Sequence, residues 1–424
     1  MLIQKRNFFS PTTMMGIAIG IVLFRFIITG VTHSYSYSRL LIPLPLLVAV
    51  FLCVRIYFPL NRKHLPGKIE KIILVSILLT SIYWSSIFIK SNAIEYSVLL
   101  EALSTEFLMF FLLYLIRSNL DVHSIYKTVG MLSYFIIWIG SALFIITPFF
   151  MDANEMINFL YPISHQLAMG SSYVMPRIRR AGFLLTLVPS AVAISAATIF
   201  FITDTLNQNL SADRPSTFRV VSILLGSLGV LMSTSFTTIT GLFFSLFILL
   251  LFTSHKKISK RSKFFMVVGS IFFTRLATLL PPGEQLVTRM KTYIDAPSSL
   301  FNAYIPKLEC SMSSLIWNNH PLSSVVSSCS FGELHVFSRI PEVGLVPELG
   351  WLFSLLIPAY FLTQYKGLSP RKRAICMFTF AFTFSALHYS GAEAWGNNYL
   401  YLFALAALLK TEHDSVLELR YGKI

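Results

Sequence analysis

The sequence contains few charged residues. Asp, Glu, Lys and Arg together make up 12% of the 424 residues, against 55% hydrophobic residues. A soluble domain carries roughly 25% charged residues. The composition therefore argues against a soluble enzyme, a nucleic-acid-binding module and a disordered chain. At about 20 apolar residues per membrane crossing, a chain of this length holds about a dozen crossings.

Signatures of nucleotide and metal chemistry are also missing. The chain has no Walker A motif, no GxGxxG, no CxxC and no DxD pair. The acids of segment 281–348 are scattered rather than clustered as ligands of a hard metal ion. We therefore expect a protein that works without a metal, a nucleotide or another cofactor.

Cysteine is scarce, with four residues in all. Cys53 and Cys376 fall in or beside apolar stretches and are expected to be chemically inert. Cys310 and Cys329 both fall in segment 281–348, which the topology below places in an oxidising compartment. A disulfide between them is the expectation, and two free buried thiols are the alternative.

Long apolar stretches fill most of the chain and predict an all-α polytopic integral membrane protein. The first follows Lys5 and Arg6, carries no Ala-x-Ala cleavage site, and is interpreted as a membrane anchor rather than a signal peptide. The predicted spans are 14–32, 40–58, 71–89, 96–116, 128–150, 182–202, 219–235, 238–253, 264–280, 349–364, 374–390 and 396–410. Segment 156–174 is a thirteenth, shorter candidate that contains Pro162 and Gly170.

Charge counting decides the topology, because Lys and Arg gather in cytoplasmic loops. With twelve spans and a cytoplasmic N-terminus, 23 Lys and Arg fall in cytoplasmic segments and 9 outside. Arg25 and Arg275 lie within spans, which accounts for all 34. A crossing at 156–174 would turn the densest basic clusters outward, so 156–181 is predicted to be re-entrant or interfacial. The chain then divides into 1–280, which includes the periplasmic segment 151–181, a periplasmic loop 281–348, and 349–424.

Two arginines in the predicted periplasmic segment 151–181 depart from the rule that Lys and Arg gather in cytoplasmic loops. Arg177 and Arg180 belong to the run Pro-Arg-Ile-Arg-Arg and would share a face of a helix. The planar guanidinium suits bidentate contacts to phosphate, so both are candidate phosphate ligands. The alternative is a different local topology, in which they are ordinary cytoplasmic anchors.

The outer loop contains a candidate for proton transfer. His335, Arg339 and Glu342 are spaced i, i+4 and i+7, and a histidine side chain titrates near neutral pH. A surface or hydrogen-bonding histidine is the alternative. His165 in the re-entrant segment and Arg275 near the outer end of its span are further candidates, since intramembrane charges usually face a cavity or partner.

Three stretches resemble the superfamily of O-antigen polymerases and O-antigen ligases. Phe159 to Ala168 is similar to the Glu-Pro-Ser-His-Phe-Ala stretch of many polysaccharide polymerases, with Tyr161 where Glu is common. Ser233 to Leu242 resembles the Ser/Thr-rich turn that opens the eighth span and lacks the Arg of many ligases. Asn319 to Leu322, His335, and Glu342 to Leu345 or Glu348 to Gly350 resemble the end of the family's outer loop.

The resemblance implies a GT-C-like architecture and a periplasmic glycosyltransferase of the bacterial inner membrane, with both termini cytoplasmic. The enzyme would polymerise repeat units carried on undecaprenyl diphosphate. It implies His335 as general base, Glu342 as its partner, and diphosphate or substrate contacts from basic side chains. These are Arg177, Arg180, Arg289, Arg339, His165, Arg275 and Lys307.

The implied partners are the lipid-linked glycan as donor and acceptor, the bilayer, a chain-length regulator and a flippase, and no nucleic acid. Two alternatives remain open. An O-antigen ligase would transfer the glycan to lipid A-core, and a flippase or transporter would move lipid-linked glycans without glycosyl transfer.

Overall fold

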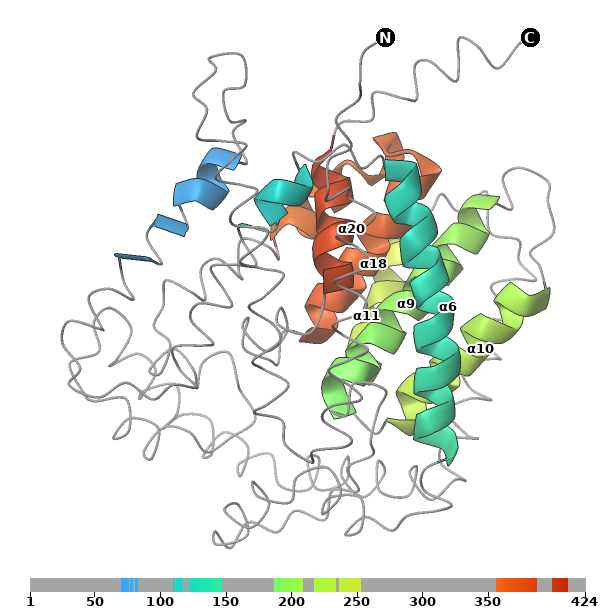
Figure 1. Ribbon diagram of the computed structural model, residues 1–424. Coiled ribbons are helices and arrows are strands. Elements are labelled where there is room, and N and C mark those ends of the chain that lie inside the picture. Colours follow the sequence, from blue (N-terminus) through green and yellow to red (C-terminus); the bar gives the residue numbers. More distant parts are fainter. Residues whose placement is uncertain are drawn as a thin grey trace, which may run out of the picture.

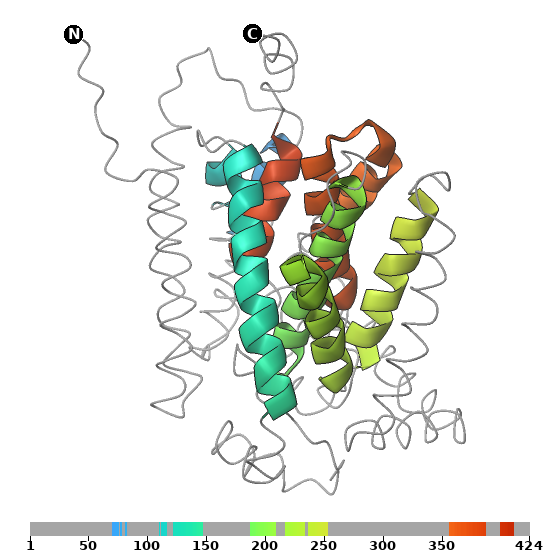
Figure 2. The same cartoon turned by 90° about the vertical axis from the view of Figure 1, so that its right-hand side faces the viewer.

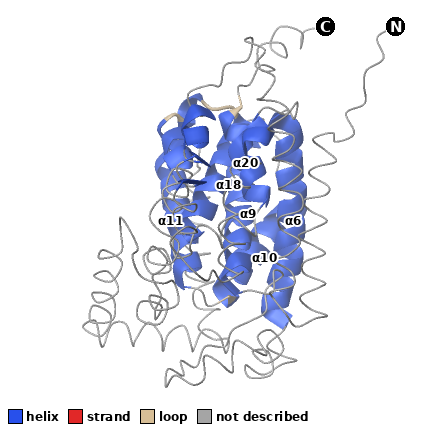
Figure 3. Ribbon diagram, turned by 60° about the vertical axis from the view of Figure 1, so that its left-hand side comes forward, coloured by secondary structure: helices blue, strands red, loops and turns tan. Residues whose placement is uncertain are grey.

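The computed structural model is helical wherever it describes the chain. Figure 3 shows helices and short connections, with no strand among the described residues, so the expected all-α class is confirmed. The described residues are 70–75, 77–78, 81–82, 110, 112–116, 122–146, 187–208, 217–233, 236–252, 356–386 and 399–410. The boundaries predicted at 280/281 and 348/349 lie outside them.

Six helices form a side-by-side bundle whose long axes are roughly aligned (Figures 1 and 2). They are α6 (Val122–Ile146), α9 (Leu187–Gln208), α10 (Thr217–Met232), α11 (Phe236–Phe252), α18 (Pro370–Ala386) and α20 (Tyr399–Leu409). A helical segment at 356–363 and the 3₁₀ turn η2 (Tyr365–Gly367) lead into α18.

Helix α9 lies at the centre of the bundle. It packs against α6, α10, α11 and α18, and every residue from Ala191 to Phe201 is buried. The apolar and small residues of this stretch have no polar face to turn toward water, as expected of a helix enclosed on all sides. Residues 401–408 of α20 are likewise all buried.

Side-chain contacts give the relative directions of the helices. Asn207, late in α9, contacts Pro370 at the start of α18, whereas Ser195, early in α9, contacts Ser385 near the end of α18. Helices α9 and α18 are therefore antiparallel. Helix α10 also runs against α9, because Arg219 pairs with Asp204 whereas the later Gly226 lies against the earlier Thr198.

Helices α6 and α10 run in the same direction. The ring of Tyr134 packs against Phe218 near the start of α10, and Ser141, further along α6, lies against Gly229, further along α10. Helix α6 is therefore antiparallel to α9. Ile146 and Leu187, the residues that flank segment 147–186, accordingly lie at the same end of the bundle.

Helices α11 and α20 run against α18. Phe252 at the end of α11 packs on Tyr365, whereas Gly241 lies against Ser385. For α20, Lys372 at the start of α18 reaches the carbonyl of Leu408. The six helices thus fall into two directions, with α6, α10 and α18 opposed to α9, α11 and α20.

The helices agree with seven of the predicted spans in position but not at every boundary. Helix α6 begins at Val122, before span 128–150. Helix α9 runs to Gln208, past span 182–202, and α18 begins at Pro370, ahead of span 374–390. The physical reason is that polar residues at these helix ends find partners in neighbouring helices, so the helices continue beyond their apolar stretches.

Of the described helices, only α6 is long and apolar enough on its own to cross a membrane. Its 25 residues correspond to about 37 Å. The apolar stretches in α9, α10 and α11 are shorter. The turn between α10 and α11 is closed by Ser233, whose hydroxyl donates to the carbonyl of Val230 at 2.6 Å.

Candidate functional site

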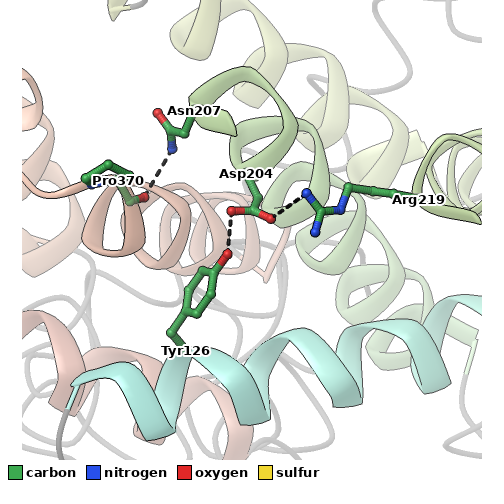
Figure 4. Close-up of polar contacts among 5 residues, drawn as sticks. All are labelled: Tyr126, Asp204, Asn207, Arg219 and Pro370. Carbon is green, nitrogen blue, oxygen red and sulfur yellow. Dashed lines mark hydrogen bonds and ion pairs between the residues drawn. The ribbon is translucent and has the colours of Figure 1, made fainter. Parts of the chain in front are cut away.

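A charged cluster joins three helices at one end of the bundle (Figure 4). Arg219 of α10 places Nη1 3.0 Å from Oδ2 of Asp204 in α9. The hydroxyl of Tyr126 in α6 donates to the other carboxylate oxygen, Oδ1. Asp204 is 5% exposed, so its carboxylate is satisfied by protein groups rather than by water.

The position of each member follows from the direction of its helix. Asp204 lies in the last turn of α9, where the helix dipole disfavours an anion. Tyr126 and Arg219 lie within the first two turns of α6 and α10, which run against α9. A buried carboxylate without such partners would cost several kcal/mol, so the pairing is what allows α9 to continue past its apolar stretch.

A second set of contacts ties the start of α18 to its neighbours. The side-chain amide of Asn207 donates to the carbonyl of Pro370 at 3.1 Å (Figure 4). The hydroxyl of Ser369 accepts from the backbone N–H of Lys372 at 3.3 Å. This is the N-cap arrangement expected where a serine precedes a helix with proline in its first position.

Two bases in the first turn of α18 bind main-chain carbonyls. Lys372 is buried, and its ammonium donates to the carbonyls of Leu408 at 3.4 Å and Lys410 at 2.6 Å. Those oxygens lie at the end of α20, where carbonyls lack partners within the helix. A cation is favourable there because the helix C-terminus is partially negative.

Arg373 makes the matching contacts to η2. It donates from Nε to the carbonyl of Tyr365 at 3.0 Å and from Nη2 to that of Lys366 at 2.6 Å. The guanidinium also lies 5.7 Å from the centre of the Tyr365 ring. Burial raises the pKa of the Tyr365 phenol above its ordinary value, so this ring remains neutral and acts as an apolar support.

All basic residues of the six helices and of segment 356–369 lie at this end, which we call the basic end. They are Lys127, Arg219, Lys366, Arg371, Lys372 and Arg373, and Lys410, directly after α20, lies there too. Asp204 is the single acid in the same described stretches. The basic end is therefore strongly cationic.

The opposite half of the bundle is uncharged and packs through hydroxyl groups and glycines. We call it the hydroxyl half, and its hydroxyl residues are Ser141, Ser195, Thr238, Thr383, Ser385 and Tyr401. The hydroxyls of Ser195 and Ser385 lie 3.5 Å apart, and those of Thr383 and Tyr401 lie 2.8 Å apart. A Cβ atom at Gly241 would lie 3.0 Å from Cα of Ser385, so α11 and α18 are in close backbone contact.

These two regions differ in the chemistry they can support. In the described part of the chain, no three His, Cys, Asp or Glu residues are grouped so that they could hold a metal ion. The hydroxyl half offers no side chain that titrates near neutral pH, and Cys376 is a buried free thiol, as expected. The basic end can hold anions, since it presents permanent positive charge beside apolar helix faces.

The catalytic and ligand residues predicted from the sequence all lie outside the described residues. They are His165, Arg177, Arg180, Arg275, Arg289, Lys307, His335, Arg339 and Glu342, together with Cys310 and Cys329. Their roles, and the possible disulfide, remain predictions.

Sequence reasoning missed the cluster around Asp204. A signal was available, because Asp204 is the single acid near the end of an otherwise apolar stretch, and Arg219 opens the next one. An ionisable residue at the edge of a span calls for a named partner. Tyr126 carried no such signal, since one tyrosine near a helix start resembles many others.

The comparisons with known proteins add no family assignment. The chain matches no protein-family model, and no curated protein or solved structure is significantly similar to it.

Proposed function

We propose that this chain is a polytopic glycosyltransferase of the bacterial inner membrane. It would extend a polysaccharide by joining repeat units carried on undecaprenyl diphosphate, as O-antigen polymerases do. Twelve spans, a GT-C-like architecture, cytoplasmic termini and an active site at the periplasmic face are part of the proposal. So are a chain-length regulator and a flippase as partners.

The outer faces of the described helices support a lipid environment. Large apolar side chains are exposed on α6, α10 and α11, for example Met131 at 65%, Phe218 at 53% and Phe247 at 54%. Helix α11 has no charged residue along its whole length. Helices that are apolar on all sides are typical of protein cores and membranes, and these faces are not in a core.

The distribution of charge supports the orientation. The basic residues of the bundle lie at the basic end, and Lys and Arg are concentrated on the cytoplasmic side of membrane proteins. We infer that the basic end is cytoplasmic. The hydroxyl half then lies toward the periplasm.

One observation carries the proposal. The described residues nearest to the two predicted periplasmic segments point to the same end of the bundle. Ile146 and Leu187 flank segment 147–186 at the end opposite the basic end. Segment 356–363 leads toward the basic end through η2, so its first residue, Leu356, also points away from that end. Segments 156–181 and 281–348, which carry most of the family resemblance, would therefore be on the same side of the membrane.

The proposed reaction is a single displacement at the anomeric carbon of the donor. An acceptor sugar hydroxyl forms the new glycosidic bond, while the bond from the anomeric carbon to the diphosphate oxygen breaks with inversion. His335 takes the hydroxyl proton as general base, and Glu342 orients His335. Arg177, Arg180, Arg289 and Arg339 stabilise the negative charge that develops on the leaving diphosphate, with His165, Arg275 and Lys307 as further contacts.

The experiment that tests the proposal is the chain-length distribution of lipopolysaccharide in a deletion strain with and without this protein. Loss of polymer with core plus one repeat unit remaining is the expected result, because the ligase still acts. Bare core with polymer on undecaprenyl diphosphate would instead identify a ligase. Bare core without periplasmic polymer would identify a flippase, and an unchanged ladder would contradict all three.

The site assignment has its own test. The His335→Ala variant should restore no polymer although it is present in the membrane at the normal level. His320→Ala removes a histidine from the same loop without a proposed role and is the matched control, which should restore the ladder. Full activity of His335→Ala would overturn the general-base assignment.

A further inference from the structure

The basic end carries more basic than acidic side chains in the six helices and the stretches that adjoin them. Seven Lys and Arg residues lie there against one acid, so seven minus one leaves six positive charges. That acid, Asp204, is already engaged by Arg219 and by the Tyr126 hydroxyl. Of the other bases, Lys127, Lys366 and Arg371 make no ion pair with a described residue.

Two of the other bases contact main-chain carbonyls. Lys372 and Arg373 donate to the main-chain carbonyls of α20 and η2. These contacts fix the two cations in place. Lys127 and Lys366 are exposed, and Arg371 is half-buried, so these three can reach an external anion.

Helix direction adds to the positive potential. Helices α6, α10 and α18 all begin at the basic end, and a helix N-terminus carries a partial positive charge. In α18 the first turn contains three bases and no acid, the reverse of the usual preference. These three cations add to the positive potential at this end.

Apolar side chains lie directly beside these cations. Met131, 65% exposed, is four residues after Lys127 and shares its face of α6. Phe218, 53% exposed, stacks on Trp138 further along α6 and continues the exposed apolar surface away from the basic end. A soluble phosphate compound would use the cations alone, whereas a phospholipid would use the cations through its headgroup and the apolar faces through its acyl chains.

We propose that the basic end binds the phosphodiester headgroups of anionic phospholipids in the cytoplasmic leaflet. Lys127, Lys366 and Arg371 supply the headgroup contacts. Clusters of Lys and Arg at the cytoplasmic ends of spans attract anionic lipids in this way. The inference rests on the membrane placement in the proposed function, but not on its catalytic residues.

The test uses the purified full-length protein in detergent, titrated with phosphatidylglycerol or with phosphatidylethanolamine. Native mass spectrometry counts the retained lipids, and thermal unfolding reports their effect on stability. Phosphatidylglycerol should be retained preferentially and should raise the unfolding temperature, with a preference that falls in high salt. Equal retention of the two lipids would overturn the inference without any variant.

The charge variants sharpen the result. Lys127→Gln/Lys366→Gln/Arg371→Gln should weaken the preference for phosphatidylglycerol at least tenfold, since each base near a membrane surface contributes to attraction. The matched control, Lys127→Arg/Lys366→Arg/Arg371→Lys, keeps every charge and should keep the preference. An unchanged preference in the glutamine variant would overturn the assignment of these three residues.

Two further experiments test whether the basic end binds a lipid headgroup rather than another anion. Inorganic phosphate at the same concentration should not displace the lipid, and displacement would point to a soluble anion instead. Glu412→Gln/Asp414→Asn/Glu418→Gln tests the acidic residues after α20, and a lipid preference seen only in that variant would overturn the proposal. Extraction of the protein from membranes by carbonate would contradict the membrane placement itself. A protein that stays in the membrane but shows no preference for phosphatidylglycerol would contradict this inference alone.

Discussion

The two ends of the bundle hold the same six helices together by different chemistry. At the basic end, ionic and charge-assisted contacts join helices that are far apart in sequence, as Asp204 and Arg219 join α9 and α10. In the hydroxyl half, glycines and small hydroxyl residues allow the backbones to approach closely, as Gly241 does beside Ser385. The charged contacts occur at one end of the bundle and the closest helix approaches occur toward the other.

This division follows from the cost of charge in an apolar medium. A charged residue is tolerated where a span meets water, because water and neighbouring helix termini can satisfy it. Deep between apolar helices, close van der Waals packing of small residues holds the helices together instead. The contrast between the ends therefore predicts where each kind of substitution is harmful.

The largest expected effect is all-or-none and concerns orientation. In a background with the four native cysteines replaced by serine, we expect Lys127→Cys to react with a membrane-impermeant maleimide only from the cytoplasmic side. Ile146→Cys should react only from the periplasmic side. Both side chains are exposed and belong to α6, and they are about 29 Å apart along its axis. Labelling of both from one side would show that α6 does not cross.

The next largest effect is on the charged cluster. Asp204→Asn leaves the guanidinium of Arg219 beside a neutral amide in a largely buried position. Breaking a buried pair by removing one partner costs about 3–5 kcal/mol, less here because the Arg219 side chain is 18% exposed. We expect a loss of about 2–3 kcal/mol in the free energy of unfolding, measured by denaturant titration in detergent.

Two variants define what that loss means. The double variant Asp204→Asn/Arg219→Gln removes both charges and should recover part of the stability, since no unpaired charge remains. Tyr126→Phe removes only the hydroxyl and should cost about 1.5 kcal/mol, as for a hydrogen bond to a charged group. If the double variant is as unstable as the sum of its single variants, the two charges are not coupled.

The charged cluster also marks the limit of what the sequence predicts. A continuous apolar stretch is a local property, so the predicted spans 128–150, 219–235 and 238–253 fall on the helices at 122–146, 217–232 and 236–252. Boundaries depend on distant partners. The extension of α9 through Asp204 requires Tyr126 and Arg219, which only the packing of α6 and α10 against α9 brings into reach. The proposed roles of His335 and the loop arginines likewise depend on contacts between residues far apart in the sequence, and they remain predictions.

A smaller effect is expected in the hydroxyl half. Gly241→Ala would place a Cβ atom against the side chain of Ser385 and 3.0 Å from its Cα. Overpacking of this kind costs about 1–3 kcal/mol, and thermal unfolding should register it. Gly367→Ala is the matched control, because a Cβ there meets nothing within 4 Å. Equal stability of the two variants would contradict the close contact between α11 and α18.

The smallest expected effect shows whether Lys372 stabilises only the last turn of α20 or the whole helix. Lys372→Met keeps an apolar stem in its buried site but removes the ammonium that binds the carbonyls of Leu408 and Lys410. A favourable cation at a helix C-terminus is worth about 0.3–1 kcal/mol, and up to about 2 kcal/mol when partly buried. We expect a loss near 1 kcal/mol and faster hydrogen exchange confined to the last turn of α20. Lys366→Met, at an exposed position, should leave both unchanged in detergent without anionic lipid. Faster exchange throughout α20 would mean instead that Lys372 holds the whole helix in the bundle.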